Sequence, residues 1–261
     1  MKSSISNGSR VPRKLVAIQP AIRPGLGFGL VLVCAATFAG MRYIGMFGPT
    51  SLRSALPLSF TIMALLPWIL LGIDGRRRIG LRRADALRWL PAAIAAGALA
   101  SLACFALGLL LFGHSADNWF VSGVHDAANY RRVMNTADMG VVTLHLVFTL
   151  PAALFSPIGE GLFFRGTFQE ALEQRFSANK STAIESAVFG LVHLCHHGLL
   201  LGAAGLSVRP VSGTLWVLLM FSVAWMFATL RKRSGSLYPA MASHAAFNVT
   251  MNLAIFAWLW F

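Results

Sequence analysis

Seven apolar stretches dominate this chain of 261 residues, and each is about as long as a helix that crosses a lipid bilayer. Such a helix needs about 20 apolar residues. Only 12% of the residues are charged, whereas a soluble domain has about 25%. The sequence therefore predicts an all-α, polytopic transmembrane helix bundle. The expected spans are residues 26–46, 55–73, 89–113, 139–158, 181–203, 211–230 and 237–261.

The chain is expected to divide into three segments. Residues 1–24 form a basic, cytoplasmic N-terminal tail, residues 25–138 hold the first three transmembrane helices, and residues 139–261 form a helical core. The first apolar stretch is long for the core of a signal peptide, so it predicts an uncleaved first helix. A signal peptide cleaved near residues 36–39 is the alternative.

The distribution of basic residues predicts the orientation of the bundle. A net charge of +13 could indicate a nucleic-acid partner, but the basic residues lie beside the apolar spans, which is the positive-inside pattern. With the N-terminus in the cytoplasm, 17 of the 22 Lys and Arg residues fall inside and five outside, Arg42 among the five. We therefore expect a multi-pass protein of the inner (plasma) membrane, no nucleic-acid partner, and contact between arginines 76–78 and anionic lipid.

Three short polar motifs interrupt the apolar spans. They are Glu160–Arg165 (E-G-L-F-F-R), Phe189–His193 (F-G-L-V-H) and His244–Asn248 (H-A-A-F-N). Ionisable groups are costly within a membrane and by default indicate function. Because the three motifs lie on separate expected helices, they predict one buried polar site.

The first motif follows residues 156–159 (S-P-I-G), which predict a break or kink in the helix. A new helix at the membrane edge would then carry Glu160 to about Phe176. Glu160 would lie in its first turn, where the helix dipole stabilises a carboxylate, near the cytoplasmic end. Arg165 is five residues further on, about 140° around the helix, and could reach the cytoplasmic interface or tie helices together.

The residue types in these motifs suit peptide hydrolysis. Glu160 could accept a proton from water as a general base, with His193 orienting that water. His244 and Asn248 are four residues apart and share one helix face. Both could donate hydrogen bonds to a carbonyl oxygen as it gains negative charge.

Other roles for the same residues stay open. Glu160 could simply begin a helix, His193 could be a core histidine, and the His244–Asn248 pair could hold helices together. A zinc-dependent site is a further alternative. His193 and His197 have the i, i+4 spacing of metal ligands, and Glu160 with His244 could complete the set. We favour a site without metal or other cofactor.

Taken together, the ordered motifs resemble the CPBP family, also known as the CAAX-protease and bacteriocin-processing or ABI family. The resemblance covers about Pro151 to Asn252 and includes the stretch S-L-Y-P-A at residues 236–240. It implies an intramembrane glutamic endopeptidase that cleaves a membrane-anchored protein or peptide. The positions that match the family's catalytic residues are Glu160, His193, His244 and Asn248, with Arg165 and Phe189 in supporting positions.

The first motif departs from the family at one position. The family has two adjacent glutamates, whereas Gly161 follows Glu160 here. Glu185 is a candidate for a partial substitute. Two classes of non-enzymatic protein also remain as hypotheses: a membrane immunity or peptide-binding protein, and a transporter, against which the lack of an internal repeat counts.

Overall fold

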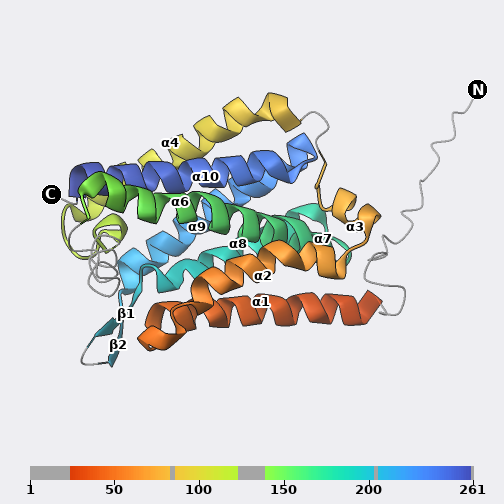
Figure 1. Cartoon of the computed structure of the whole chain (residues 1–261), viewed down its shortest axis with the longest axis horizontal. Helices are drawn as coiled ribbons and strands as arrows, with labels where there is room; N and C mark the ends of the chain where they lie inside the picture. The colour runs from red at the N-terminus through yellow and green to blue at the C-terminus, as the bar shows by residue number, and fades with distance from the viewer. Residues whose placement is uncertain (1–23, 83–85, 123–138, 203–204, 260–261) are drawn as a thin grey trace, which may run out of the picture.

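A computed structural model describes residues 24–82, 86–122, 139–202 and 205–259, and the expected N-terminal tail lies outside them. Long helices run side by side along the molecule (Figure 1). Five stretches are long and apolar enough to cross a membrane: Gly27–Phe47, Thr50–Leu70, Ala86–Phe112, Val141–Glu173 and Pro210–Ser234. The predicted all-α membrane helix bundle is confirmed. The helices are α1 (Pro24–Phe47), α2 (Ala55–Leu70), α3 (Ile73–Arg78), α4 (Ala86–Phe112), α6 (Val141–Glu160), α7 (Gln169–Glu173), α8 (Ala178–Val192), α9 (Pro210–Ser234) and α10 (Leu237–Ala254).

The sequence predicted a break or kink at residues 156–159 and a new helix after it. The predicted break and separate helix were wrong, because the helical structure is continuous there. Helix α6 continues past Glu160 as a π-helix, Gly161–Phe168, and then as α7. Pro157 lies inside α6. Gly159 serves close packing, because a Cβ there would lie 2.5 Å from the carbonyl oxygen of Phe60 on α2. Tertiary packing thus outweighs the local helix-breaking preference, and Glu160 does not lie in the first turn of a separate membrane-edge helix.

The span expected at residues 181–203 was also wrong in its second half. Helix α8 ends at Val192 and is followed by a 3-10 helix, His193–Cys195. Gly198 then adopts φ +113°, a conformation that glycine reaches without strain. The chain enters an antiparallel hairpin of β1 (Leu199–Gly202) and β2 (Gly205–Val208), with Leu199 opposite Val208.

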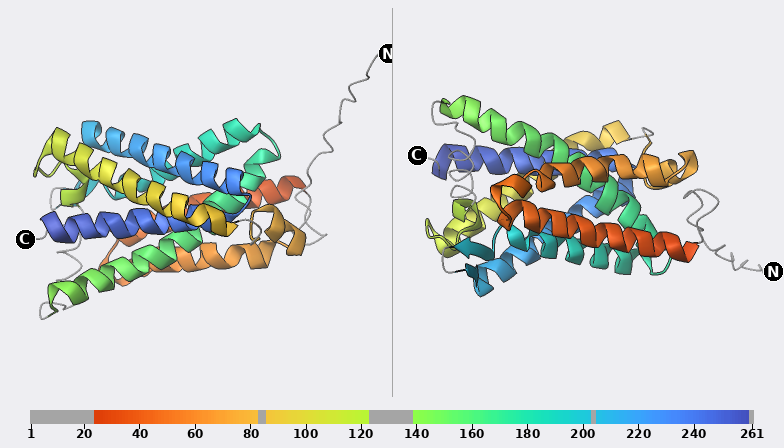
Figure 2. Two further views of the ribbon diagram at one scale, coloured as in Figure 1. Left: turned by 90° about the horizontal axis from the view of Figure 1, so that it is seen from above. Right: turned by 60° about the horizontal axis from the view of Figure 1, so that its bottom comes forward.

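Helix α10 lies between α4 and α6 in both the front view and the view from above (Figures 1 and 2). It also packs on α9, which in turn packs on α8, while α1 contacts α2 and α2 contacts α6. Phe38, Phe163, Phe168 and Phe189 belong to one buried cluster that joins α1, the π-helix and α8. These contacts bring all three polar motifs toward the middle of the bundle.

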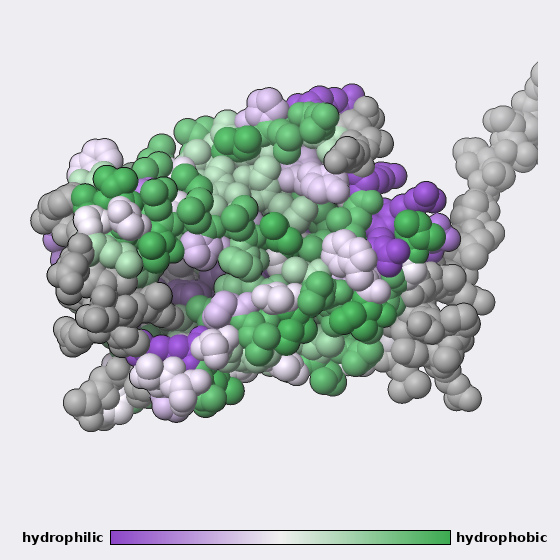
Figure 3. Space-filling view, viewed as in Figure 1, coloured by the Kyte–Doolittle hydropathy of each residue, from purple (hydrophilic) through white to green (hydrophobic). Residues whose placement is uncertain are grey.

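The face seen in Figure 3 is mostly hydrophobic, and most of its hydrophilic side chains lie at the end that carries α3, with a smaller group near the β-hairpin. Leu87, Leu110 and Val142 are among the large apolar side chains left exposed. Lipid tails would cover such side chains in a membrane. The opposite end carries the β-hairpin and the end of α10 (Figure 1).

Candidate active site

Glu160 is the centre of the candidate site. Its side chain is fully buried and forms an ion pair with Arg42. The hydroxyl of Ser156 donates a hydrogen bond of 3.2 Å to Oε2. Nε2 of His244 lies 3.7 Å from the same carboxylate oxygen. The first and third motifs therefore meet at one carboxylate, as the sequence predicted.

Arg42 on α1 is a site residue that the sequence analysis missed. Its side chain is only 4% exposed, and one end of the guanidinium binds Glu160. Nη1 lies 3.2 Å from Nε2 of His193. The charge count placed Arg42 on the outer side of the membrane, whereas it lies within the candidate span Gly27–Phe47. The signal was present, because an arginine within an apolar stretch is itself a functional hypothesis.

The contacts of His193 define its tautomer. Arginine has no acceptor atom, so Nε2 must accept the hydrogen bond from Arg42. Nδ1 must then carry the proton, which it donates to the carbonyl oxygen of Phe189 at 2.7 Å. This tautomer turns the lone pair of Nε2 toward the site. His193 is thus linked to Glu160 through Arg42.

His244 and Asn248 lie on the face of α10 that meets α6. The His244 ring stacks on Phe227, with 4.9 Å between centroids and 24° between planes. Nδ2 of Asn248 donates a 2.8 Å hydrogen bond to the carbonyl oxygen of Ala152. The amide group has a second N–H for another partner. The predicted common face of the pair is confirmed.

A comparison with known families identifies the segment that carries all three motifs. Residues 141–250 match the family model described as type II CAAX prenyl endopeptidase Rce1-like. This segment is therefore similar to an Rce1-like CAAX endopeptidase domain. The match is consistent with the CPBP family and confirms the resemblance seen in the sequence. No curated protein and no solved structure matches the chain.

The arginine of the first motif, Arg165, pairs with Glu185 rather than with Glu160. Nη1 of Arg165 is 3.0 Å from Oε1 of Glu185, and both side chains are buried. The guanidinium carbon lies 4.0 Å from the ring centroid of Phe189 and 5.3 Å from that of Phe227. Of the two roles considered, Arg165 therefore ties helices together. Glu185 serves as its counter-ion, which is a different task from that of a second glutamate beside Glu160.

At Gly161, where the family has its second glutamate, the side chain of Met241 from another helix fills the space. A Cβ at Gly161 would lie 2.5 Å from Cγ and 3.2 Å from Sδ of Met241 on α10. Met241 also packs against the buried cluster that contains Leu162 and Leu237. The departure at Gly161 is thus matched by a methionine in the facing helix.

We predict that Gly161→Glu destabilises the protein by about 1–3 kcal/mol, because overpacking forces neighbouring side chains to shift. Met241→Ala in the same chain should recover part of this loss. The measurement is the unfolding free energy in detergent micelles, with Gly140→Glu as control, since a Cβ at Gly140 meets nothing within 4 Å. Equal stability of Gly161→Glu and wild type would contradict this packing.

The metal-ligand spacing of His193 and His197 is not realised, because α8 ends before His193. Nδ1 of His197 lies 2.9 Å from the Ser122 hydroxyl, and Nε2 lies 2.9 Å from the Ser212 hydroxyl. Both ring nitrogens are therefore engaged away from Glu160. Within the described ranges, no three His, Cys, Asp or Glu side chains are grouped as ligands of one metal ion.

Proposed function

We propose that the protein is an intramembrane endopeptidase in which Glu160 activates a water molecule to hydrolyse a peptide bond of a membrane-associated substrate. The Rce1-like domain implies a CAAX-type intramembrane protease. One observation carries the glutamate mechanism. Glu160 is buried, lies within contact distance of His244, and is linked to His193 through Arg42. A general base must reach its water within hydrogen-bond distance.

In the first step, water lies between Glu160 and Nε2 of His193. Glu160 takes a proton from this water while the Nε2 lone pair accepts its other hydrogen. The water oxygen bonds to the carbonyl carbon, and the carbonyl oxygen becomes an anion. Arg42 now bridges the two groups, so water entry requires Arg42 to give up one contact. Its remaining contact supplies a counter-charge within the apolar bundle.

In the second step, His244 and the free N–H of Asn248 donate hydrogen bonds to the oxyanion. One such donor contributes about 10²–10³ in rate. The carbon–nitrogen bond then breaks, and Glu160 transfers its proton to the leaving amine. The products are a new carboxyl terminus and a new amino terminus, and Glu160 returns to its starting state.

The depth of the site supports a membrane-associated substrate. Glu160 is the twentieth residue of the span Val141–Glu173, so at about 1.5 Å per residue the two ends of the span are roughly 28 and 20 Å away. A recess with hydrophilic side chains at its bottom is visible on the face that carries α2 and α6 (Figure 3). A substrate held in the bilayer could enter from this side.

The distribution of exposed basic residues favours an N-terminus in the cytoplasm. Exposed basic residues lie at one end of the bundle, where α3, α8 and the α9–α10 turn meet; they include Arg77, Arg78, Arg82, Lys180 and Arg233. Positive charge concentrates on the cytoplasmic side of membrane proteins. We therefore propose a plasma-membrane protein with this end inside.

The test compares the termini of membrane proteins in cells that produce wild type or His193→Ala. We expect a set of cleaved products in wild type and the corresponding intact precursors in the variant, at equal protein level. His114→Ala is the matched control, because His114 is exposed at the other end of the bundle. Identical termini in all three samples would overturn the peptidase assignment and favour a peptide-binding protein.

A further inference from the structure

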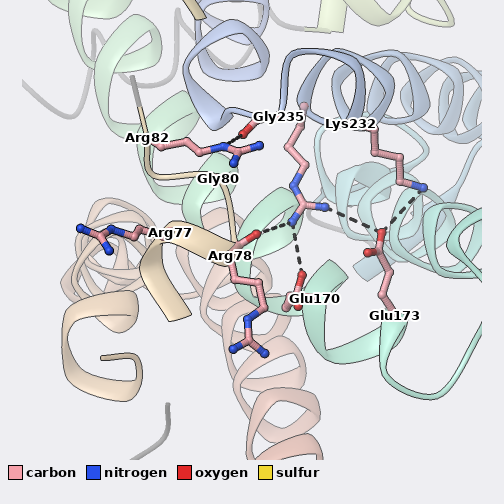
Figure 4. A pocket seen from close by; sticks show the side chains of 9 residues that line it. Arg77, Arg78, Gly80, Arg82, Glu170, Glu173, Lys232 and Gly235 are labelled. Carbon is pink, nitrogen blue, oxygen red and sulfur yellow. Dashed lines mark hydrogen bonds and ion pairs between the residues drawn. The ribbon is translucent and has the colours of Figure 1, made fainter. Parts of the chain in front are cut away.

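A second charged site lies at the basic end of the bundle, away from Glu160. It is a pocket of about 560 Å³, a size within the usual range of small-molecule sites, about 300–1,000 Å³. Three segments distant in sequence line it (Figure 4). The lining residues are Arg77, Arg78, Gly80, Arg82, Glu170, Glu173, Arg231, Lys232 and Gly235.

Positive charge exceeds negative charge in this pocket. The two carboxylates already have basic partners, since Arg231 lies 3.5 Å from Glu170 and 3.7 Å from Glu173. Lys232 lies 3.7 Å from Glu173 as well. Arg77 also lies 3.8 Å from Asp74, which is not part of the lining. The lining itself holds five basic and two acidic side chains, and this excess of positive charge favours an anion as the ligand.

The wall of the pocket is held in place by hydrogen bonds between its segments. Nε of Arg82 donates to the carbonyl oxygen of Gly235 at 2.6 Å, as Figure 4 shows. The backbone N–H of Leu237 donates to the carbonyl oxygen of Gly80 at 2.9 Å. Nε of the buried Arg231 lies 3.4 Å from the carbonyl oxygen of Ile79. Arg82 and Arg231 are thus positioned without any ligand, which reduces the entropic cost of binding one.

The pocket lies at the depth of lipid headgroups. Arg231 is near the end of α9, and Glu173 ends the span that begins at Val141. Exposed apolar side chains, Ile73 and Phe176 among them, flank this end of the bundle. Guanidinium groups match the geometry of phosphate oxygens, and the cytoplasmic leaflet presents anionic phospholipids at this level.

We propose that this pocket binds the phosphate of an anionic phospholipid headgroup. It would fix the depth of the bundle beside α7 and α9. This goes beyond a general attraction of arginines 76–78 to lipid, because the pocket adds Arg231 and Lys232 from α9 and does not include Arg76.

The test titrates short-chain phosphatidylglycerol and short-chain phosphatidylcholine against the full chain in neutral detergent and counts bound lipid by native mass spectrometry. We expect saturable binding of phosphatidylglycerol and little binding of phosphatidylcholine. The double variant Arg78→Gln/Arg82→Gln should weaken binding by about 30-fold. Lys180→Gln/Arg233→Gln removes the same charge from exposed positions at the same end that do not line the pocket, and it should bind like wild type.

Inorganic phosphate, titrated in place of lipid, distinguishes the source of the phosphate group. Weak or undetectable binding of inorganic phosphate supports a lipid ligand. Binding as tight as that of phosphatidylglycerol would overturn the lipid assignment. Equal binding of both lipids, or equal losses in the two double variants, would overturn the pocket itself. None of these readouts depends on peptidase activity.

Discussion

Replacing Arg165 with Met is expected to lower the free energy of unfolding by about 3–5 kcal/mol, because Glu185 would remain buried without its partner. Methionine keeps much of the apolar volume beside Phe189 and Phe227, so the loss should come mainly from the uncompensated carboxylate. The measurement is reversible unfolding in mixed micelles. Arg233→Met is the control, since Arg233 is exposed and surface substitutions usually change stability by less than 0.5 kcal/mol, roughly.

The double variant Arg165→Met/Glu185→Leu separates the cost of an unpaired buried charge from the cost of altered side-chain packing. Removing both members of a buried ion pair is often neutral, because no charge is left without a partner. We therefore expect the double variant to unfold closer to wild type than Arg165→Met does. A double variant that is less stable than the single variant would contradict the role of Glu185 as counter-ion.

The sequence was sufficient to predict the membrane bundle and the convergence of the motifs. Spacing alone placed His244 and Asn248 on one face, and the structure directs both toward α6. This succeeded because helical periodicity is local: residues four apart share a face whatever surrounds them. The cost of burying ionisable groups in lipid made Glu160 and His193 candidates for the same reason.

Local sequence preferences gave the wrong prediction where tertiary packing determines the backbone conformation. Pro157 and Gly159 predicted a break, but α2 packs against Gly159 and the helix continues into a π-helical segment. π-Helical turns often occur at functional sites, and this one begins directly after Glu160. No local rule would place it there from this sequence.

Arg42 could be predicted only in part. Its position within an apolar stretch marked it as unusual, but the residue lies outside the matched segment 141–250. Its pairing with Glu160 depends on how α1 packs against the rest of the bundle, and single-sequence periodicity carries no information about that contact. Met241 beside Gly161 was missed for the same reason.

The central claim is that Glu160 acts as the base that activates water. Glutamine has nearly the same shape but cannot take a proton from water, so Glu160→Gln should lower the cleavage rate by about 10²–10⁴-fold. Glu160→Gln leaves the buried Arg42 without the carboxylate that it pairs with. The double variant Arg42→Gln/Glu160→Gln removes both charges, so it tests the same claim without an unpaired buried arginine. Asp117→Asn, at a carboxylate that is 56% exposed and lies outside both sites, is the control and should retain cleavage.

The decisive measurement is the rate constant for cleaving a precursor found by the termini comparison, with purified protein in lipid vesicles. Each variant's unfolding temperature is recorded on the same sample. We predict that folded Glu160→Gln and folded Arg42→Gln/Glu160→Gln both lose cleavage by at least about 100-fold. Cleavage at the wild-type rate by either folded variant would contradict the account.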